Sequence, residues 1–273
     1  MAIITTISSI DIPELQPYRI FSHKCELKYK GMFVAEGEKI INRLLNSTIE
    51  IISFLVTPRT LERFQTQFES ERFNNTQIFL AEQSLAETIT GYYIHQGIMA
   101  LCKIPDDTPI EKAISNTQQP CLFIALDGVV NTDNVGGIVR NSVGFGVDLL
   151  ITGNSSASPY YRRSVRNSMG TVFNLPVFHS ENLESDIREL KLTHKFRIIA
   201  AHPNGNKELH QINLRENTCI ILGNEDKGMS DSLLAICDEK AGIPMMHETD
   251  SLNVSNASAV FLYEAIRQRK TNI

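Results

Sequence analysis

Four short apolar runs in the second half of the chain constrain its fold most strongly. They are Cys121–Leu126, Val147–Thr152, Phe196–Ala201 and Thr218–Leu222. Each is apolar almost throughout rather than at alternate positions, which is typical of strands buried on both faces of a parallel sheet. Helical patterns accompany them, among them Val135–Gly144 and a long amphipathic stretch at Ser251–Arg269. This alternation predicts a doubly wound α/β domain, which binds ligands at the carboxyl ends of its strands.

A smaller α/β pattern precedes these runs. Helical spacing of apolar residues predicts a helix at Gly37–Leu45, and apolar runs predict strands at Ile51–Val56, Gln77–Leu80 and Gly97–Cys102. Prolines and polar residues then gather in the stretch 104–119, which is typical of a domain boundary. We therefore predict an N-terminal domain at residues 1–108, a linker at 109–119 and a C-terminal domain at 120–273.

The composition excludes several classes of protein. Hydrophobic residues make up 42% and charged residues 21% of the chain, as in ordinary globular proteins. No apolar run is long enough to span a membrane, and the first residues are a poor signal peptide. The five cysteines form no CxxC pair, which favours reduced thiols and a cytoplasmic location. The net charge of −5 argues against binding nucleic acid over the whole surface, although it permits a local basic patch.

Several common catalytic signatures are missing from the sequence. No strand is followed by the glycine fingerprint of dinucleotide-binding folds, and neither a P-loop nor the nucleophile elbow of α/β-hydrolases occurs. The seven histidines lack the spacing of zinc ligands, so we expect no metal site.

Three polar clusters remain, and each follows an apolar run. They lie at residues 131–140, 222–230 and 243–258. In the first cluster, Asn134 has the position of a helix N-cap, and Gly136 and Gly137 within a helix indicate close packing or a nearby ligand. In the second cluster, Gly223 allows the backbone to approach another group closely, and Glu225 places a carboxylate at a strand's carboxyl end.

The third cluster contains more polar groups than capping requires. Ser251, Asn253 and Ser255 all lie in or near the first turn of the predicted C-terminal helix. A helix needs only one N-cap, so capping accounts for one of the three side chains.

The order of these clusters resembles the SpoU-type (TrmH-like) RNA 2′-O-ribose methyltransferases of the SPOUT class. The matching segments are Asn134-Val-Gly-Gly-Ile-Val-Arg140, Leu222-Gly-Asn-Glu225, Ile243-Pro-Met245 and Ser251-Leu-Asn-Val-Ser255. Two further segments, Phe33–Glu38 and His95–Ala100, resemble the accessory domain of these enzymes, which is similar to ribosomal protein L30e.

The resemblance implies a fold and an assembly. It implies an α/β-knot in the C-terminal domain, with a deep trefoil knot, a parallel sheet and helices on both faces. The N-terminal domain would be a small L30e-like α/β domain that binds RNA. S-adenosylmethionine (AdoMet) would bind in the knot crevice of a homodimer whose active site lies at the subunit interface. Apolar Val260, Phe261 and Ala265 on the last helix would face the partner.

The resemblance also assigns roles in methyl transfer to a ribose 2′-hydroxyl of rRNA or tRNA. Arg140 would lie beside the 2′-hydroxyl, either as the base or as a ligand of phosphate or of the developing alkoxide. The second role suits a guanidinium better, because its planar fork of N–H donors fits the oxygens of a phosphate or an alkoxide. Asn134 would orient Arg140 or the substrate, Glu225 and Ser251 would support that network, and Asn253 would hold substrate or cofactor.

The cofactor and RNA sites are expected on separate residues. Backbone and apolar groups at Gly223, Ile243, Met245 and Leu252 would bind AdoMet, although Ile243 and Leu252 also fit an ordinary core. Predicted RNA contacts are Lys28, Tyr29 and Lys30 in a basic stretch, and Arg162, Arg163 and Arg166. The basic stretch also fits a solvated polar segment.

Two other functions stay open. One is a non-catalytic RNA-binding or ribosome-assembly protein that has kept the fold. The other is an enzyme acting on a small molecule, which the missing glycine fingerprint disfavours.

Overall fold

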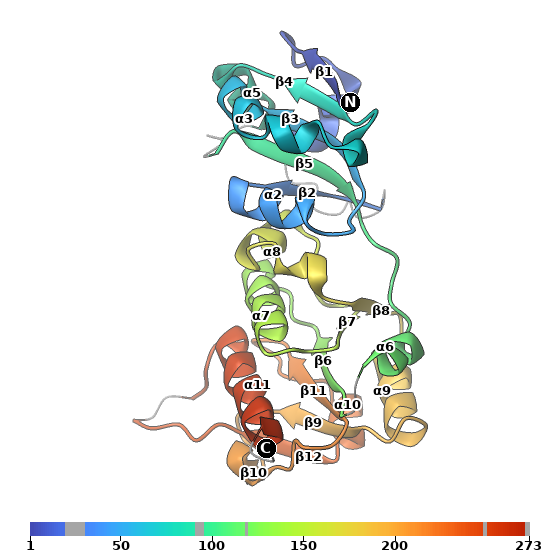
Figure 1. Cartoon of the computed structure of the whole chain (residues 1–273). Coiled ribbons are helices and arrows are strands. Elements are labelled where there is room, and N and C mark those ends of the chain that lie inside the picture. Colours follow the sequence, from blue (N-terminus) through green and yellow to red (C-terminus); the bar gives the residue numbers. More distant parts are fainter. Residues whose placement is uncertain (20–30, 91–95, 118–119, 248–249, 271–273) are drawn as a thin grey trace. The chain divides into compact units, whose positions relative to one another are not determined.

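The structure is a computed structural model that describes residues 1–19, 31–90, 96–117, 120–247 and 250–270 (Figure 1). The chain divides into two compact units. The first comprises Met1–Pro105 together with Tyr160–Phe173, and the second comprises Asp106–Pro159 together with Asn174–Ile273. No helix of the described residues is long and apolar enough to cross a membrane.

The first unit contains a five-stranded sheet with the order β1-β4-β3-β5-β2. Its strands are β1 (Ile3–Thr6), β2 (Met32–Glu36), β3 (Ile51–Val56), β4 (Gln77–Leu80) and β5 (Ile98–Lys103). Strands β1, β4 and β3 are parallel, whereas β5 runs antiparallel to both β3 and β2. The helices are α2 (Glu38–Leu45), α3 (Pro58–Arg63), α4 (Gln65–Phe68) and α5 (Gln83–Thr90). The predicted helix at 37–45 and the three predicted strands are therefore confirmed, while β1 and β2 were not predicted.

Apolar side chains pack against both faces of this sheet at its central strand β3, whereas the edge strand β1 is exposed. Neighbouring residues of a strand point to opposite faces. Leu55 therefore packs in one core together with Tyr18, which ends the 3₁₀ helix Pro13–Tyr18 that precedes β2 in the chain. Phe54, on the other face, packs edge-on against Phe68 and Phe73 with centroids 4.9 and 5.8 Å away. Covering both faces explains why these strands are apolar along most of their length.

A segment from the middle of the chain also belongs to the first unit. It contains α8 (Arg162–Asn167) and a short 3₁₀ turn, and its Tyr160 and Phe173 rings lie 5.4 and 6.0 Å from the ring of Phe33. Arg162 forms an ion pair with Glu36 at the end of β2. The single predicted boundary at 109–119 did not foresee that the chain returns to the first unit at Tyr160 and leaves it again after Phe173.

The second unit is built on a parallel seven-stranded sheet with the order β10-β12-β9-β11-β6-β7-β8. Its strands are β6 (Leu122–Asp127), β7 (Leu149–Gly153), β8 (Val177–Ser180), β9 (Arg197–Ala201), β10 (Lys207–Glu208), β11 (Thr218–Gly223) and β12 (Glu239–Gly242). The four predicted strands are β6, β7, β9 and β11, and they are consecutive in the sheet in the order β9-β11-β6-β7. Their carboxyl ends consequently lie along one edge.

Helices cover this sheet and supply part of its core. They are α6 (Ile110–Asn116), α7 (Thr132–Gly144), α9 (Leu183–Leu192), α10 (Asp231–Ile236) and α11 (Val254–Lys270). Residues 109–119, predicted as a linker, instead contain α6, whose Ile110 and Ala113 are buried in the core of the second unit. The prediction took Pro105, Pro109 and the neighbouring acidic residues as marks of a domain boundary, but the apolar residues of α6 recur at helical spacing.

Helices α7 and α11 cross closely at Gly137. A Cβ atom at this position would lie only 2.8 Å from Cβ of Ser255, so the crossing leaves no room for a side chain. Next to it, Asn141 Nδ2 donates to the carbonyl oxygen of Ser255 at 2.7 Å and to Oγ of Ser258 at 3.0 Å. The glycine inside α7 is thus explained by close helix packing rather than by a ligand.

The last helix differs in one respect from the prediction. Phe261 and Ala265, predicted to face a partner subunit, are buried within the second unit. Helix α11 instead exposes Val260 and Tyr263, whose relative exposures are 38% and 59%. The spacing of apolar residues identified the helix, but it could not say which apolar stripe the chain's own sheet would cover.

Candidate active site

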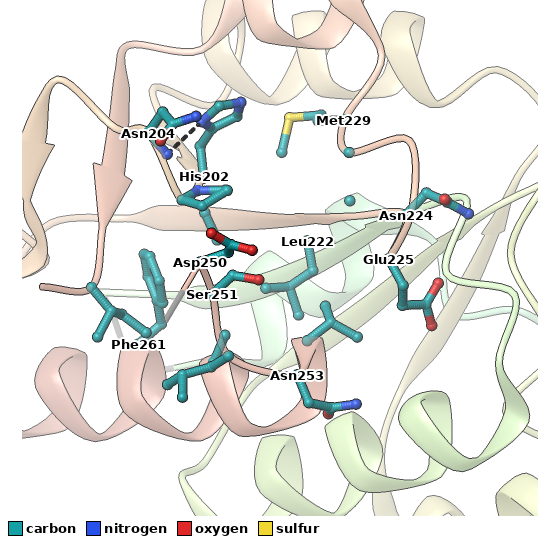
Figure 2. Close-up of a pocket in the computed structure, with 18 of the residues that line it drawn as sticks. His202, Asn204, Leu222, Asn224, Glu225, Met229, Asp250, Ser251, Asn253 and Phe261 are labelled. Carbon is teal, nitrogen blue, oxygen red and sulfur yellow. Dashed lines mark hydrogen bonds between the residues drawn. The ribbon is translucent and has the colours of Figure 1, made fainter. Parts of the chain in front are cut away.

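A pocket of about 490 Å³ lies at the edge of the second sheet where β9, β11 and β12 end (Figure 2). Its lining residues are Ala201–Asn204, Leu222–Met229, Ala241, Ile243, Met245, Asp250–Val254, Ala257 and Phe261. They come from the loops that follow these strands and from the start of α11. Parallel strands bring their carboxyl ends to one edge, which is where such sheets bind ligands.

The loop after β11 forms one wall of the pocket. Asn224 and Gly228 exchange two backbone hydrogen bonds of 3.0 Å, and the Asn224 side chain accepts from the backbone N–H groups of Asp226 and Lys227. A Cβ atom on Gly223 would lie 2.7 Å from the backbone nitrogen of Met229. The group that approaches Gly223 closely is therefore this loop's own backbone, and any larger residue would open the loop.

A chain of side-chain hydrogen bonds connects α7, the β11 loop and α11. Asn134 Nδ2 donates to Oε1 of Glu225 at 2.7 Å, and Asn253 Nδ2 donates to Oδ1 of Asn134 at 2.9 Å. Asn253 Oδ1 in turn accepts from both the backbone N–H and Oγ of Ser255. Three of the five predicted catalytic residues therefore form one network.

The structure separates capping from other roles in these clusters. Asn131, rather than Asn134, is the N-cap of α7, because its side chain accepts from the N–H of Asp133 at 2.8 Å. Asn253 has the capping geometry at α11 through the N–H of Ser255. Asn134 and Ser251 are left for other tasks, since Asn134 is buried in the network and Ser251 lines the pocket.

The predicted cofactor residues all lie around the same pocket. Gly223, Ile243, Met245 and Leu252 line it, and the three apolar side chains are half-buried. Ile243 and Leu252 thus lie at the wall of a pocket, and their contact with a cofactor stays a prediction. Glu225, Ser251 and Asn253 line the pocket too, and in Figure 2 Glu225 and Asn253 lie at one end of it.

Several lining residues were not predicted. His202 and Asn204 lie at the other end of the pocket in Figure 2, and the Asn204 backbone N–H donates to Nδ1 of His202 at 3.1 Å. Because Nδ1 is the acceptor, the neutral ring carries its proton on Nε2 and can donate a hydrogen bond. A detectable signal existed, since His202 directly follows the predicted strand at 196–201, just as Gly223 and Glu225 follow the strand at 218–222.

Arg140 is not part of this arrangement. Its side chain is exposed on α7, and it neither lines the pocket nor joins the hydrogen-bond network around Asn134. Six residues along a helix turn the direction of a side chain by about 120° relative to the first. The contacts of Asn134 are with Glu225 and Asn253, and none with Arg140 is seen among the described residues.

The remaining predicted residues lie outside the pocket. Lys28, Tyr29 and Lys30 are outside the described residues. On α8, Arg163 and Arg166 are exposed, whereas Arg162 is half-buried against Glu36. Burial lowers the pKa of the Arg162 guanidinium from its usual value, and the neighbouring Glu36 carboxylate opposes that shift. A pairing of this kind suits an arginine that holds α8 in place.

One possible metal-ligand group is found in the described part of the chain. Glu111, Glu189 and His194 have potential ligand atoms within 4.8 Å of one another, and both glutamates are exposed. None of the three lines the pocket. The expectation that the active site uses no metal therefore stays a prediction.

A match to a protein-family description decides the family. The SpoU rRNA Methylase family model matches residues 121–263, which is more than half of the chain. This chain belongs to the SpoU rRNA Methylase family. The match includes every predicted catalytic and cofactor residue, from Asn134 to Asn253.

Two relatives match most of the chain. An uncharacterised tRNA/rRNA methyltransferase of Mycobacterium bovis is 28% identical over 87% of this chain and 82% of its own length. The 23S rRNA (guanosine-2′-O-)-methyltransferase RlmB of Bordetella pertussis is 30% identical over 64% of this chain and 72% of its own.

Two solved structures share the fold. An AdoMet-bound rRNA methyltransferase from Sinorhizobium meliloti matches with a TM-score of 0.82 at 23% identity, over 97% of this chain and 98% of its own. The SpoU methyltransferase AviRb of Streptomyces viridochromogenes, in complex with AdoMet, matches with a TM-score of 0.80 at 21% identity, over 95% and 100%. The expected α/β fold class is thereby confirmed. The trefoil knot and the L30e-like character of the first unit stay predictions.

Proposed function

We propose that this protein is an AdoMet-dependent methyltransferase that methylates a ribose 2′-hydroxyl of rRNA or tRNA. The observation that carries the proposal is the pocket at the ends of β9, β11 and β12. It unites four predicted cofactor residues with three predicted catalytic residues. The family membership and the relatives named as 23S rRNA 2′-O-methyltransferases support the same reaction.

The lining of the pocket suits AdoMet. Its volume of about 490 Å³ is in the range of small-molecule sites. Leu222, Ile243, Leu252 and Phe261 supply apolar surface for an adenine ring. The pocket lining contains three carboxylates, Glu225, Asp226 and Asp250, and one lysine, Lys227. This excess of negative charge favours a positively charged group such as a sulfonium.

The side chains around the pocket would orient the reacting groups. When AdoMet is bound, it supplies an activated methyl group for an in-line displacement by the ribose oxygen. Asn134 lies between the other two side chains, because its Nδ2 donates to the Glu225 carboxylate and its Oδ1 accepts from Nδ2 of Asn253, so Glu225 and Asn253 keep set positions at the pocket. Such fixed positions lower the entropic part of the barrier. We assign Ser251, whose hydroxyl lines the pocket, to the same network.

We further propose that the active enzyme is a homodimer in which a second copy brings Arg140 to the pocket. The exposure of Arg140 away from its own pocket supports this assignment. A second support is the exposed apolar pair Val260 and Tyr263 on α11, a helix that packs against α7, which carries Arg140. Arg140 would then bind the RNA phosphate or stabilise the alkoxide through the N–H donors of its planar guanidinium.

We also propose that the first unit binds the RNA substrate. The predicted location of the enzyme is the cytoplasm, because rRNA and tRNA are found there. The alternative, a binding protein without activity, is disfavoured because Asn134, Glu225 and Asn253 form an intact network. It predicts RNA binding without AdoMet binding.

The reaction can be tested directly. The purified protein is titrated with AdoMet by calorimetry with and without a chelator, and then incubated with deproteinised rRNA and tRNA and methyl-labelled AdoMet. We expect metal-independent binding and, after nuclease digestion, label in 2′-O-methylnucleosides. Absence of AdoMet binding would contradict the proposal, as would label found only on bases.

The oligomeric state needs its own measurement. Light scattering at micromolar concentration should give twice the mass of one chain. Mixing an Arg140→Ala variant with a Glu225→Gln variant should restore part of the activity that each lacks, because one of the two hybrid pockets would be complete. A monomer, or no recovery on mixing, would refute the shared site.

A further inference from the structure

The turn that carries Glu225 lies beyond the end of the second sheet. The paired residues of β11 and β6 end with Gly223 and Asp127, and the turn residues 225–227 that follow are exposed. Core packing therefore does not set the position of the Glu225 carboxylate. Figure 2 shows Asn224 next to Glu225 at this end of the pocket, and the hydrogen bonds of Asn224 show how the turn is held.

The Asn224 side chain forms hydrogen bonds in two directions. Its Oδ1 accepts from the backbone N–H groups of Asp226 at 2.9 Å and of Lys227 at 2.8 Å, which closes the turn on itself. Its Nδ2 donates to the carbonyl oxygen of Gly128 at 2.6 Å, which fastens the turn to the segment after β6. An amide accepts at its oxygen and donates at its nitrogen, so a single asparagine makes both sets of bonds.

The segment that accepts this bond is itself fixed. Oγ of Ser156 accepts from the N–H of Gly128 at 3.0 Å and donates to the carbonyl oxygen of Leu126 at 3.0 Å. Asn131 then caps α7, and Asn134 lies in the first turn of that helix. The bond accepted at Gly128 thus ties the turn after β11 to the start of the helix that carries Asn134.

We propose that Asn224 is a positioning residue for methyl transfer, which sets the Glu225 carboxylate at hydrogen-bonding distance from Asn134. The inference rests on the proposed methyltransferase function. The bond from Asn134 Nδ2 to Glu225 Oε1, at 2.7 Å, joins the turn after β11 to α7, and the amide of Asn224 joins the same turn to the segment that leads into α7. In this role Asn224 acts through Glu225 rather than on the reacting atoms.

Replacing Asn224 with aspartate separates its two functions. A carboxylate still accepts from the two N–H groups of the turn, so the wall of the pocket at Gly223 is kept. It cannot donate to the carbonyl oxygen of Gly128, and its charge repels both that oxygen and the Glu225 carboxylate. Glu225 should then lose its set position, and a displacement of about 1 Å slows an enzyme reaction by on the order of 100-fold.

The test compares Asn224→Asp with Asn154→Asp. Asn154 Nδ2 donates to the carbonyl oxygen of Glu181 at 2.8 Å, so this control loses the same kind of bond and gains the same charge outside the pocket. The single-turnover rate at saturating RNA and AdoMet should fall by about 10- to 100-fold in Asn224→Asp and by less than about threefold in the control. AdoMet affinity, measured by calorimetry, should not fall in either variant, because an added carboxylate does not repel a sulfonium.

A double-variant cycle distinguishes positioning from a general loss of structure. Glu225→Ala removes the carboxylate that Asn224 is proposed to position. Adding Asn224→Asp to Glu225→Ala should therefore slow the reaction by less than about twofold, because residues that act through one contact do not have additive effects. Rate losses that multiply in the double variant would overturn the inference, as would a wild-type rate in Asn224→Asp alone.

A second measurement does not depend on catalysis. The side-chain amide signals of Asn134 in a ¹⁵N NMR spectrum, assigned by their loss in Asn134→Asp, report its bond to Glu225. They should shift in Asn224→Asp as they do in Glu225→Ala, and they should stay in place in Asn154→Asp. Unchanged signals in Asn224→Asp would overturn the inference. A wild type that transfers no methyl group would refute the proposed function, whereas the expected shift would still support the placement of Glu225 by Asn224.

Discussion

Replacing Gly137 with alanine sets two effects of known sign against each other. Alanine stabilises a helix interior by about 1 kcal/mol relative to glycine. The new Cβ atom, however, would lie 2.8 Å from Cβ of Ser255 and 3.0 Å from its Oγ, well inside the contact distance of about 3.5–4.0 Å. Overpacking of this kind costs about 1–3 kcal/mol.

Ser255 has little freedom to move away. Its backbone N–H and hydroxyl both donate to Asn253, and its carbonyl oxygen accepts from Asn141. We therefore expect Gly137→Ala to lower the free energy of unfolding by on the order of 1–2 kcal/mol. The shift of α11 should also lengthen the contact between Asn253 and Asn134 and slow methyl transfer.

Urea unfolding and single-turnover methylation measure the two effects. Gly144→Ala is the matched control, because it lies in the same helix and a Cβ there meets nothing within 4 Å. It should leave stability unchanged or slightly raised. Adding Ser255→Gly to Gly137→Ala should recover part of the lost stability. A Gly137→Ala variant that is more stable than the wild type and equally active would show that the helix crossing is not tight.

Three other predictions follow from the site and the core. Asn134→Asp should reduce the single-turnover rate of methylation by 10-fold or more at unchanged AdoMet affinity, because a carboxylate cannot donate to Glu225 and repels it. A normal rate would show that the hydrogen bond from Asn134 to Glu225 is not needed for methyl transfer. Arg140→Ala should abolish methyl transfer while leaving AdoMet affinity nearly intact. Arg140→Lys should be almost as inactive, since an ammonium group cannot form the two parallel hydrogen bonds of a guanidinium. A near-wild-type rate in either variant would show that Arg140 is a surface residue without a role in the reaction. Burial raises the pKa of the Cys102 and Cys219 thiols, so unfolded thiols ionise first as the pH rises above about 8.5. The stability that these thiols contribute is complete below that pH and should fall above it by up to about 1.4 kcal/mol per pH unit for each, as urea unfolding at pH 7.5 to 9.5 would show, and an equal slope in Cys102→Ala/Cys219→Ala would contradict this.

The strands and the edge that carries the site were predictable because their signals are local. A strand buried on both faces must be apolar along its length, as Thr218–Leu222 shows, and its polar successors must then lie at the sheet's edge. The family motifs predicted roles for Glu225 and Asn253, and both residues line the pocket. The same rule would have found His202, had it been applied to the strand at 196–201.

Other features depended on neighbours that are distant in sequence. Asn134 has the pattern of an N-cap, and only the approach of Glu225, 91 residues away, shows that its amide is used across the site. Gly223 is required by the backbone at Met229, and the apolar Phe261 turns toward the chain's own core rather than toward a partner. The short segment with α8 lies inside the family match but packs with the first unit through Glu36. The spacing of residues along a chain shows which of them share a face of one helix or strand, because backbone geometry repeats. Which helix or strand covers that face is decided by the packing of all the elements in the folded chain.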